Sequence, residues 1–562
     1  MEGSGARRTG PSRRELIVAG SASALALTAG VGVTAPPVEA AGIVFDDRSE
    51  TGRRRPGDPG IPGVMVSNGR DVVVTDAEGR WRLPLAEGES VFVVKPPGWA
   101  TPTGPGGVPR FSYLHQPGGT PRDLACRYAG VAPTGPLPNP IELPLRRRPE
   151  PRRFDVLLAA DTQPENATEL AYLRDDIVSA MLGRGAAFGI NHGDIVGDDL
   201  SLYPRYLEVL GATGIPWHHC PGNHDMNLEA HSDRFSRETW KRVFGPRHYA
   251  FQHAGATFIL LDNVHYFGRV PGTPRSGRYC GLIGADQLAF VAGILARVPA
   301  DRLVVLCMHI PLRTYQDPAN PADNTADCAA LLRLLAGRPH CVSFSGHMHL
   351  IEHHYLAAGT ETGAGPRHHH HVLAAGSGSW WSGPRDYRGL PSADCPDGSP
   401  NGFHVLSVDG SHYAAEFVPA VRKGADRLRI LIDGPHRRDR GPAARLGAVP
   451  HAPIPVSALP ACEVVVNVFD GGPRTQVVCE MAGAGASPLA LQRAAVADPF
   501  IATLFAQHPE TLKPWVAAVP SSHLWKGPLP RGLSPGAHCL TVRARNEFGV
   551  EHTAHVVLEV TA

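Results

Sequence analysis

A series of short apolar runs, each ending in polar residues, constrains the fold of this chain more than any other feature. The first two runs, 154–160 and 186–190, have the length of buried strands and are separated by a helical pattern at 168–182. Strand, helix and strand, with polar residues at the carboxyl ends of the strands, predict an α/β domain whose site lies along one sheet edge. Four more runs follow at 215–217, 256–262, 303–308 and 341–345.

The polar residues at the ends of five runs have side chains that bind metal ions. One acid or histidine at a strand end would mean little, whereas five such groups in series are hard to explain as structural polar residues. In the central group an amide, an imidazole and a carboxylate are consecutive, and Gly222 before them is expected to let the backbone turn sharply. The groups are Asp161 and Gln163; Asp194; Asn223, His224 and Asp225; His309; and His347 and His349.

This series resembles, in the same order, the sequence pattern of the calcineurin-like metallophosphoesterase family. Segments outside it, at 368–371, 379–381 and 467–472, are similar to an exported bacterial branch of that family with three domains. In that branch one β domain precedes the catalytic core and another follows it. The resemblance therefore implies an α/β core, an αββα-type sandwich, flanked by two all-β sandwich domains.

The resemblance also implies two adjacent divalent metal ions, with Asp194 as the bridging ligand. Asp161, Gln163 and His349 would complete the first site, and Asn223, His309 and His347 the second. Oxygen and imidazole ligands without thiolate suit Mn, Fe, Co or Zn, and the sequence does not choose among them. Gln163 stands where the family usually has a histidine. An amide oxygen is a weaker ligand than imidazole, so we expect the first metal to be held more loosely.

The expected activity is that of a metal-dependent phosphoric ester hydrolase. A water that bridges the two metals would attack the phosphorus of a phosphate monoester or diester. His224 would protonate or stabilise the leaving oxygen while Asp225 holds its other ring nitrogen, although His224 could also be purely structural. The alternative is a weakly active or non-catalytic metal-bound surface binding protein, against which the His224–Asp225 pair argues. The substrate, a small molecule or a cell-envelope phosphoester, is left open.

Residues 1–41 are expected to be a twin-arginine signal peptide. Ser12-Arg13-Arg14-Glu15-Leu16-Ile17 resembles the twin-arginine motif, and a mildly apolar run (18–33) and a small-residue site (38–40) follow it. The run has about 16 residues, short of the roughly 20 that a membrane span requires. No later segment is long and apolar enough to span. We therefore expect export to the periplasm or the extracellular space, with no transmembrane span in the mature chain.

The rest of the chain divides around the catalytic domain, expected at 151–422. Short strand patterns with Asn68-Gly69 and Glu78-Gly79 turns predict a small β-sandwich at 42–150, similar to transthyretin-like or carboxypeptidase regulatory domains. Residues 423–562 predict an immunoglobulin- or fibronectin-like sandwich with a helical insertion near 489–515. Within it Cys462 and Cys479 could form a disulfide, and the pairing is left open.

Composition adds two points. A net charge of +1 gives no electrostatic reason to expect a nucleic-acid partner. The 28 histidines exceed what packing needs. Four of them, His368–His371, are consecutive in a probable strand, so alternate side chains face opposite sides and at most two could face the site. A chance tract and a substrate-binding role both remain open for them. Trp380 and Trp381 follow on a loop and are hypothesised to stack a sugar or base.

Overall fold

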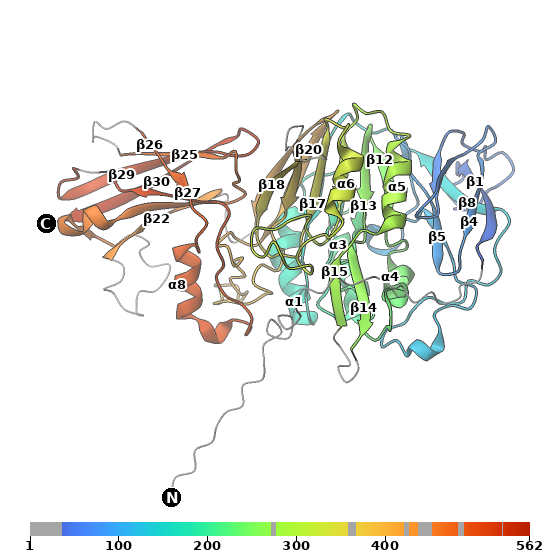
Figure 1. Cartoon of the computed structure of the whole chain (residues 1–562), viewed down its shortest axis with the longest axis horizontal. Coiled ribbons are helices and arrows are strands. Elements are labelled where there is room, and N and C mark those ends of the chain that lie inside the picture. Colours follow the sequence, from blue (N-terminus) through green and yellow to red (C-terminus); the bar gives the residue numbers. More distant parts are fainter. Residues whose placement is uncertain are drawn as a thin grey trace, which may run out of the picture.

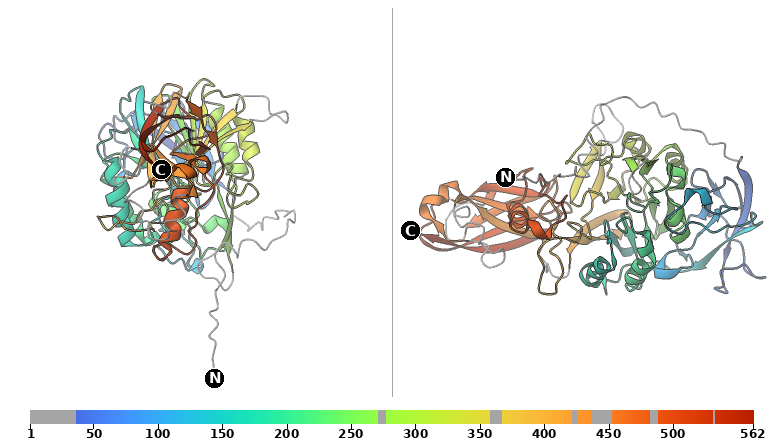
Figure 2. Two further views of the ribbon diagram at one scale, coloured as in Figure 1. Left: turned by 90° about the vertical axis from the view of Figure 1, so that its left-hand side faces the viewer. Right: turned by 90° about the horizontal axis from the view of Figure 1, so that it is seen from below.

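The computed structural model describes residues 36–270, 277–357, 367–420, 426–435, 452–481, 488–530 and 532–562. A β domain, a central α/β domain and a second β domain lie in a row along the long axis (Figures 1 and 2). This confirms the predicted core with flanking β domains. Most of the predicted signal peptide lies outside the described residues, but Val38 to Ala41 belong to the first strand.

The N-terminal domain consists of two four-stranded sheets, ordered β4-β1-β8-β6 and β3-β2-β5-β7. Strand β4 shows why they pack: Trp81, Leu83 and Leu85 are buried while the residues between them are exposed, the alternation of a sheet with one solvated face. The strands are β1 (Val38–Asp46), β2 (Met65–Ser67), β3 (Val72–Val74), β4 (Arg80–Leu85), β5 (Glu89–Val93), β6 (Trp99–Ala100), β7 (Ser112–His115) and β8 (Ile141–Arg147).

The central domain stacks a five-stranded sheet, β11-β10-β9-β20-β21, on a six-stranded sheet, β12-β13-β16-β17-β19-β18. Strands β9, β10 and β11 are parallel, as are β13, β16, β17 and β19, so their carboxyl ends share one edge. The strands are β9 (Arg153–Ala159), β10 (Phe188–Asn191), β11 (Trp217–His219), β12 (Tyr249–His253), β13 (Ala256–Leu260), β16 (Val304–Cys307), β17 (Cys341–Ser345), β18 (Glu352–Ala357), β19 (Arg367–Val372), β20 (Gly402–Asp409) and β21 (His412–Pro419). The hairpin of β14 (Val264–Arg269) and β15 (Gly277–Gly281) extends beside them.

Alternate residues of β9 show the αββα layering. Val156 and Leu158 join the core between the two sheets, whereas Leu157 packs under the helices of the outer face. On the other outer face α5 and α6 cover the six-stranded sheet (Figure 1). The helix predicted at 168–182 is a helical segment that includes a π-helical turn, η3. The helices are α1 (Ala167–Tyr172), η3 (Leu173–Val178), α2 (Ser179–Met181), α3 (Tyr203–Gly211), α4 (Glu238–Val243), α5 (Ala285–Leu295) and α6 (Cys328–Leu335).

The C-terminal domain is a second two-sheet sandwich, ordered β22-β24-β28-β27 and β23-β30-β29-β25-β26. The predicted helical insertion is α8 (Pro499–Gln507), which lies beside the central domain (Figure 1). All ten cysteines are thiols, including Cys462 and Cys479. The strands are β22 (Leu428–Asp433), β23 (Ile454–Pro455), β24 (Glu463–Val468), β25 (Gln476–Met481), β26 (Leu489–Ala490), β27 (Gln492–Arg493), β28 (Leu524–Pro528), β29 (Gly536–Arg545) and β30 (Glu551–Thr561).

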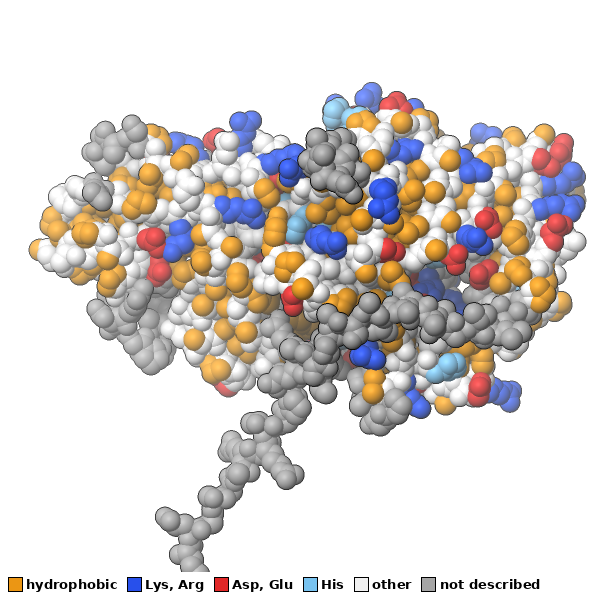
Figure 3. Space-filling view, in the orientation of Figure 1, with side chains coloured by type: hydrophobic (Ala, Val, Ile, Leu, Met, Phe, Trp, Pro, Cys, Tyr) orange, Lys and Arg blue, Asp and Glu red, His pale blue; other side chains and the backbone are white. Residues whose placement is uncertain are grey.

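Two surface properties bear on partners. On the face seen in Figure 3, basic side chains lie among acidic ones, so the described residues of this face form no broad region of one sign. Within the described part of the chain, none of the helices has both the length and the apolar character needed to cross a bilayer.

Candidate metal centre

Four of the predicted ligands are in direct contact at the common edge of the two sheets. His309 follows β16, and its Nε2 lies 2.9 Å from Asn223 Oδ1, 3.1 Å from His347 Nδ1 and 3.4 Å from Asp194 Oδ1. These residues follow four different strands, so only the fold brings them together. Ligand atoms of Asp194, His309 and His347 all lie within 4.8 Å of one another, close enough to hold one cation.

The other three predicted ligands adjoin this cluster. Asp161 accepts the backbone N–H of His347 at 2.8 and 3.0 Å, and its Oδ1 lies 3.7 Å from His349 Nε2. The backbone N–H of Gln163 donates to Asp194 O at 3.0 Å. Gln163 Oε1 is buried and has no hydrogen-bond partner among the described residues. An unpaired buried acceptor costs about 1–3 kcal/mol, so this oxygen fits ligation of a cation, as the sequence predicted.

The backbone at these ligands is strained. A non-glycine residue with positive φ is uncommon and costs of order 1–3 kcal/mol, and such residues cluster at functional sites. Five of the seven predicted ligands have positive φ. They are Asp161 (48°), Gln163 (37°), Asp194 (50°), His347 (76°) and His349 (55°). Because positive φ recurs at five predicted ligands along one sheet edge, the strain favours a functional site whose geometry its ligands impose.

Two glycines are needed here for space. A Cβ on Gly222 would lie 2.1 Å from Asp194 Oδ1, and one on Gly346 would lie 2.4 Å from Asp161 Oδ2. The chain turns here as predicted, since the backbone N–H of Asp225 donates to Gly222 O at 3.3 Å. Gly222 is not among the glycines with positive φ, so its own backbone angles do not require glycine. Its role is to let the loop approach the carboxylate of Asp194 closely.

Hydrogen bonds of the histidines fix which nitrogen faces the site. His309 Nδ1 donates to His192 O at 2.9 Å and His349 Nδ1 to Gly378 O at 2.6 Å, because a carbonyl oxygen can only accept. The Nε2 lone pairs are therefore free for a cation. Burial lowers the pKa of His349 to about 3, so its imidazole is neutral. For His347 the assignment is reversed, since its Nε2 lies 3.4 Å from Asp323 Oδ1 and Nδ1 faces His309.

The two carboxylates differ in their protonation. Burial raises the pKa of Asp161 to about 7. Burial acts in the same direction on Asp194, but the imidazoles of His309 and His224 outweigh it and hold the pKa of Asp194 below its usual range. Asp194 is therefore ionised throughout the neutral range, which suits a ligand shared by two cations.

Metal affinity is expected to fall as the pH drops below about 7. In the metal-free protein Asp161 is then protonated, and a cation must displace the proton, so each pH unit should weaken binding by about tenfold. The pKa of Asp161 is higher in the folded chain than in the unfolded chain. Ionisation of Asp161 therefore destabilises the metal-free fold as the pH rises from the unfolded-state pKa toward 7. Calorimetric titration of metal-free protein with Zn²⁺ at several pH values measures the slope. Equal affinity on both sides of neutrality would contradict the prediction, and Asp161→Asn should abolish the slope.

His224 is oriented by Asp198, and not by Asp225 as the sequence predicted. Its Nδ1 lies 2.7 Å from Asp198 Oδ1. The carboxylate of Asp225 points the other way and accepts from Gly222 N at 2.9 Å, from Tyr203 Oη at 3.0 Å and from Ile195 N. Consecutive side chains of this turn diverge, so the acid next in sequence stabilises the loop while Asp198 holds the ring. The pattern carried no signal for Asp198 beyond its place four residues after Asp194.

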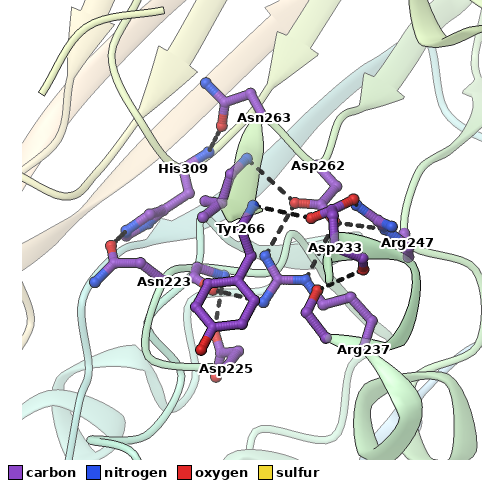
Figure 4. Close-up of polar contacts among 12 residues, drawn as sticks. Asn223, Asp225, Asp233, Arg237, Arg247, Asp262, Asn263, Tyr266 and His309 are labelled. Atoms are coloured by element: carbon purple, nitrogen blue, oxygen red, sulfur yellow. Dashed lines mark hydrogen bonds and ion pairs between the residues drawn. The ribbon is translucent and has the colours of Figure 1, made fainter. Parts of the chain in front are cut away.

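A buried network of ion pairs supports the loop that contains Gly222 (Figure 4). Arg237 contacts both oxygens of Asp262 at 3.1 Å and donates from Nη1 to Gly222 O at 3.0 Å. Arg247 bridges Asp262 and Asp233. Asn263, the residue after Asp262, accepts the backbone N–H of His309 at 3.1 Å. Sequence reasoning missed these residues, although Asp262 ends the fourth predicted strand.

Trp380 and Trp381 form part of the wall of the site. Trp380 stacks on His349, with ring centroids 4.0 Å apart, and its edge meets Trp515 of the C-terminal domain. Trp381 is buried and donates from Nε1 to Thr162 O at 2.8 Å. The hypothesis that the pair stacks a substrate ring is therefore wrong for Trp381, whose faces are enclosed by the core.

The four consecutive histidines alternate as predicted. His368 and His370 both contact Ser343 Oγ, at 2.8 and 2.7 Å, on one side of β19. His369 and His371 stack with His353 on the opposite side. Within the described residues, the hydrogen bonds and ring contacts of these four histidines do not include the predicted metal ligands.

Three family models match consecutive parts of the chain. The model described as calcineurin-like phosphoesterase matches residues 154–350, that of its N-terminal part residues 48–124, and that of its C-terminal part residues 370–552. No curated protein matches the chain. Among solved structures, the chain is similar to a purple acid phosphatase isolated from yellow lupin (Lupinus luteus) seeds. The identity is 12%, the TM-score is 0.33, and the match covers 64% of this chain and 67% of that chain.

Proposed function

This chain belongs to the calcineurin-like phosphoesterase family and is a metal-dependent phosphoester hydrolase, and from that premise we propose that it works with two divalent cations outside the cytoplasm. The observation that carries the two-cation proposal is the buried cluster that surrounds Asp194, in which Gln163 Oε1 has no hydrogen-bond partner within the described part of the chain. One cation, of the Mn, Fe, Co or Zn type, would be held by Asp161, Gln163 and His349. The other would be held by Asn223, His309 and His347, with Asp194 shared.

When bound, the cations supply Lewis acidity toward the phosphoryl oxygens and lower the pKa of coordinated water. The chain supplies the geometry. Asp194 Oδ1 accepts the backbone N–H of His224 at 2.8 Å. This bond fixes the loop that carries His224, the proposed acid, to the proposed shared ligand Asp194. The His224 side chain keeps 22% of its surface exposed, more than Asp194 or His309, so it can reach a substrate. Its Nδ1 lies beside Asp198, and its Nε2 lies 3.9 Å from Asp194 Oδ2, so Nε2 is the nitrogen at the cluster that would protonate a leaving oxygen.

Hydrolysis of p-nitrophenyl phosphate and bis-p-nitrophenyl phosphate by metal-free and metal-reconstituted protein tests the proposal. We expect turnover that depends on added Mn²⁺, Fe²⁺, Co²⁺ or Zn²⁺ and requires two equivalents of metal bound at the Asp194 cluster. The ratio of the two rates would separate monoester from diester preference. Full activity with a single equivalent would overturn the two-cation mechanism. Absence of turnover in folded, metal-loaded protein would contradict hydrolysis of these esters.

Replacing His224 with glutamine should slow the hydrolysis of esters with poor leaving groups more than that of esters with good leaving groups. A general acid contributes about 10²–10⁴-fold when the leaving oxygen needs a proton, so phenyl phosphate should lose more than p-nitrophenyl phosphate. Asp198→Asn should show the same pattern with a smaller loss, of about 10–100-fold. The exposed His231 provides the control His231→Gln. Equal losses for both esters would indicate that His224 only supports the loop.

We also propose export through the twin-arginine route. The support is the sequence Ser12-Arg13-Arg14-Glu15-Leu16-Ile17 and the apolar run after it. Fractionation of cells that express the full chain should recover the protein outside the cytoplasm, and changing Arg13 and Arg14 to lysine should retain it inside. Equal distribution of the two forms would argue against this route.

A further inference from the structure

A second cluster of histidines lies apart from the residues proposed to bind the catalytic cations. The Nε2 atoms of His353, His371 and His404 lie 3.1, 2.8 and 3.1 Å from one oxygen, Asp470 Oδ1. All three histidines are fully buried, and Asp470 is 4% exposed. Ligand atoms of His353, His371 and Asp470 all lie within 4.8 Å of one another.

The four residues come from three different sheets. His353 and His371 lie on β18 and β19 of the six-stranded sheet, and His404 lies on β20 of the five-stranded sheet. Asp470 belongs to the C-terminal domain, two residues after β24 ends. It has a φ of 69°, the strained conformation also found at the predicted catalytic ligands. The cluster therefore joins both layers of the central domain to the domain that follows.

Hydrogen bonding alone does not account for this arrangement. His371 Nε2 lies 2.8 Å from Asp470 Oδ1, yet neither ring nitrogen of His371 has a hydrogen-bond partner among the described residues. The Nδ1 of His404 is likewise buried and unsatisfied. Each unsatisfied buried group costs about 1–3 kcal/mol. His353 and His404 already use the two lone pairs that Asp470 Oδ1 offers as an acceptor, so the third imidazole, His371 at 2.8 Å, has none left there.

Coordination of a cation accounts for it better. Ligand atoms at about 2.0–2.1 Å from a tetrahedral zinc ion lie about 3.3 Å apart, and the nitrogen–oxygen distances in the cluster are close to that edge. His353 Nδ1 lies 2.9 Å from His369 Nε2, and His369 Nδ1 lies 2.8 Å from the Tyr413 hydroxyl. This chain of contacts allows His353 to carry its proton on Nδ1 and to present a bare Nε2 to a metal.

We propose that His353, His371 and Asp470 bind a structural divalent cation of the zinc type, while His404, 3.1 Å from Asp470 Oδ1, orients that carboxylate from the other sheet. A closed set of imidazole and carboxylate groups without solvent access is typical of a structural site. The ion would hold the C-terminal domain against both sheets of the core. It shares no ligand with the proposed catalytic pair, so its presence can be tested separately from the proposed function.

The test measures the metal content of full-length protein in which the catalytic centre has been removed by Asp161→Asn and His309→Gln. After incubation with Zn²⁺ and desalting, this variant is expected to retain about one zinc ion per chain. Adding His371→Gln should remove it, whereas adding His368→Gln should not. His368 is the matched control because it lies on the same strand, is also buried, and faces Ser343 on the other side.

Cobalt(II) in place of zinc should give the intense visible bands of a tetrahedral site in the variant that lacks the catalytic centre. If the His371→Gln protein does not fold, zinc-edge X-ray absorption of that parent variant decides the question. Four nitrogen and oxygen ligands with imidazole scattering support the proposal, and a six-coordinate shell overturns it. Retention of no metal by the folded parent variant, or equal metal content with His368→Gln and His371→Gln, also overturns it.

Discussion

Asparagine in place of Asp194 is expected to lower kcat for p-nitrophenyl phosphate by at least about 10³-fold, more than the loss of one electrostatic contact in an active site. The carboxylate lies between His309, 3.4 Å from its Oδ1, and the backbone N–H of His224, 2.8 Å away. Asparagine keeps the size of the side chain but is neutral and replaces one ligating oxygen with an amide nitrogen. It can no longer screen the repulsion between the two proposed cations.

The measurement is kcat at saturating metal, together with the metal content of the same sample. A matched control is Asp175→Asn, whose partly exposed carboxylate contacts Arg174 on the surface. We expect the control to keep parental activity and metal content. Activity of the Asp194 variant within tenfold of the parent would rule out the bridging role.

Replacing Arg237 with methionine is expected to reduce the free energy of unfolding by about 3 kcal/mol, the scale for breaking a buried ion pair. Both Arg237 and Asp262 are fully buried. Burial by itself raises the pKa of Asp262, but Arg237 and Arg247 lower it to about 2. With Arg237 removed, the carboxylate of Asp262 keeps Arg247 as its one cationic partner among the described residues, and Gly222 O keeps only the backbone N–H of Asp225 as a donor there. Activity should therefore fall together with stability.

Calorimetric unfolding of the central domain measures the effect. The exposed pair Arg174–Asp175 supplies the control Arg174→Met, expected to change the free energy by less than about 1 kcal/mol. A double variant, Arg237→Met with Asp262→Asn, should cost less than the sum of the single changes, because each single change leaves a buried charge without its partner whereas the double change removes both charges. Additive costs would show that the pair is not coupled.

Sequence reasoning located the strands and the candidate ligands for the same reason. A buried parallel strand is a continuous apolar run, so its carboxyl end is visible in the sequence, and Asp161, Asp194 and His309 stand at such ends. The partner of His224 could not be identified in this way. Whether Asp198 or Asp225 faces the ring depends on backbone angles within one turn, and Asp198 has a φ of 66°. Periodicity carries no information about such angles.

The histidines near the C-terminal domain show a second limit. The alternation of His368–His371 was predictable from the strand period, but its meaning depends on Asp470, about a hundred residues later in the chain. Contacts between sheets of different domains leave no local pattern. The buried network of Arg237 and Asp262 was missed for another reason: in the sequence, a charged pair in a core looks the same as two surface residues.

The start of β1 has a consequence for maturation on the proposed export route. Val38, Glu39, Ala40 and Ala41 pair with Leu85, Pro84, Leu83 and Arg82 of β4, which makes four of the six residue pairs between these strands. Peptidases act on extended, unpaired backbone. Cleavage after residue 41 in an already folded precursor would first require this end of β1 to separate from the sheet, and would leave Arg82 to Leu85 without their partner strand. Cleavage of the signal peptide and pairing of β1 with β4 would therefore compete for the same four residues, Val38 to Ala41.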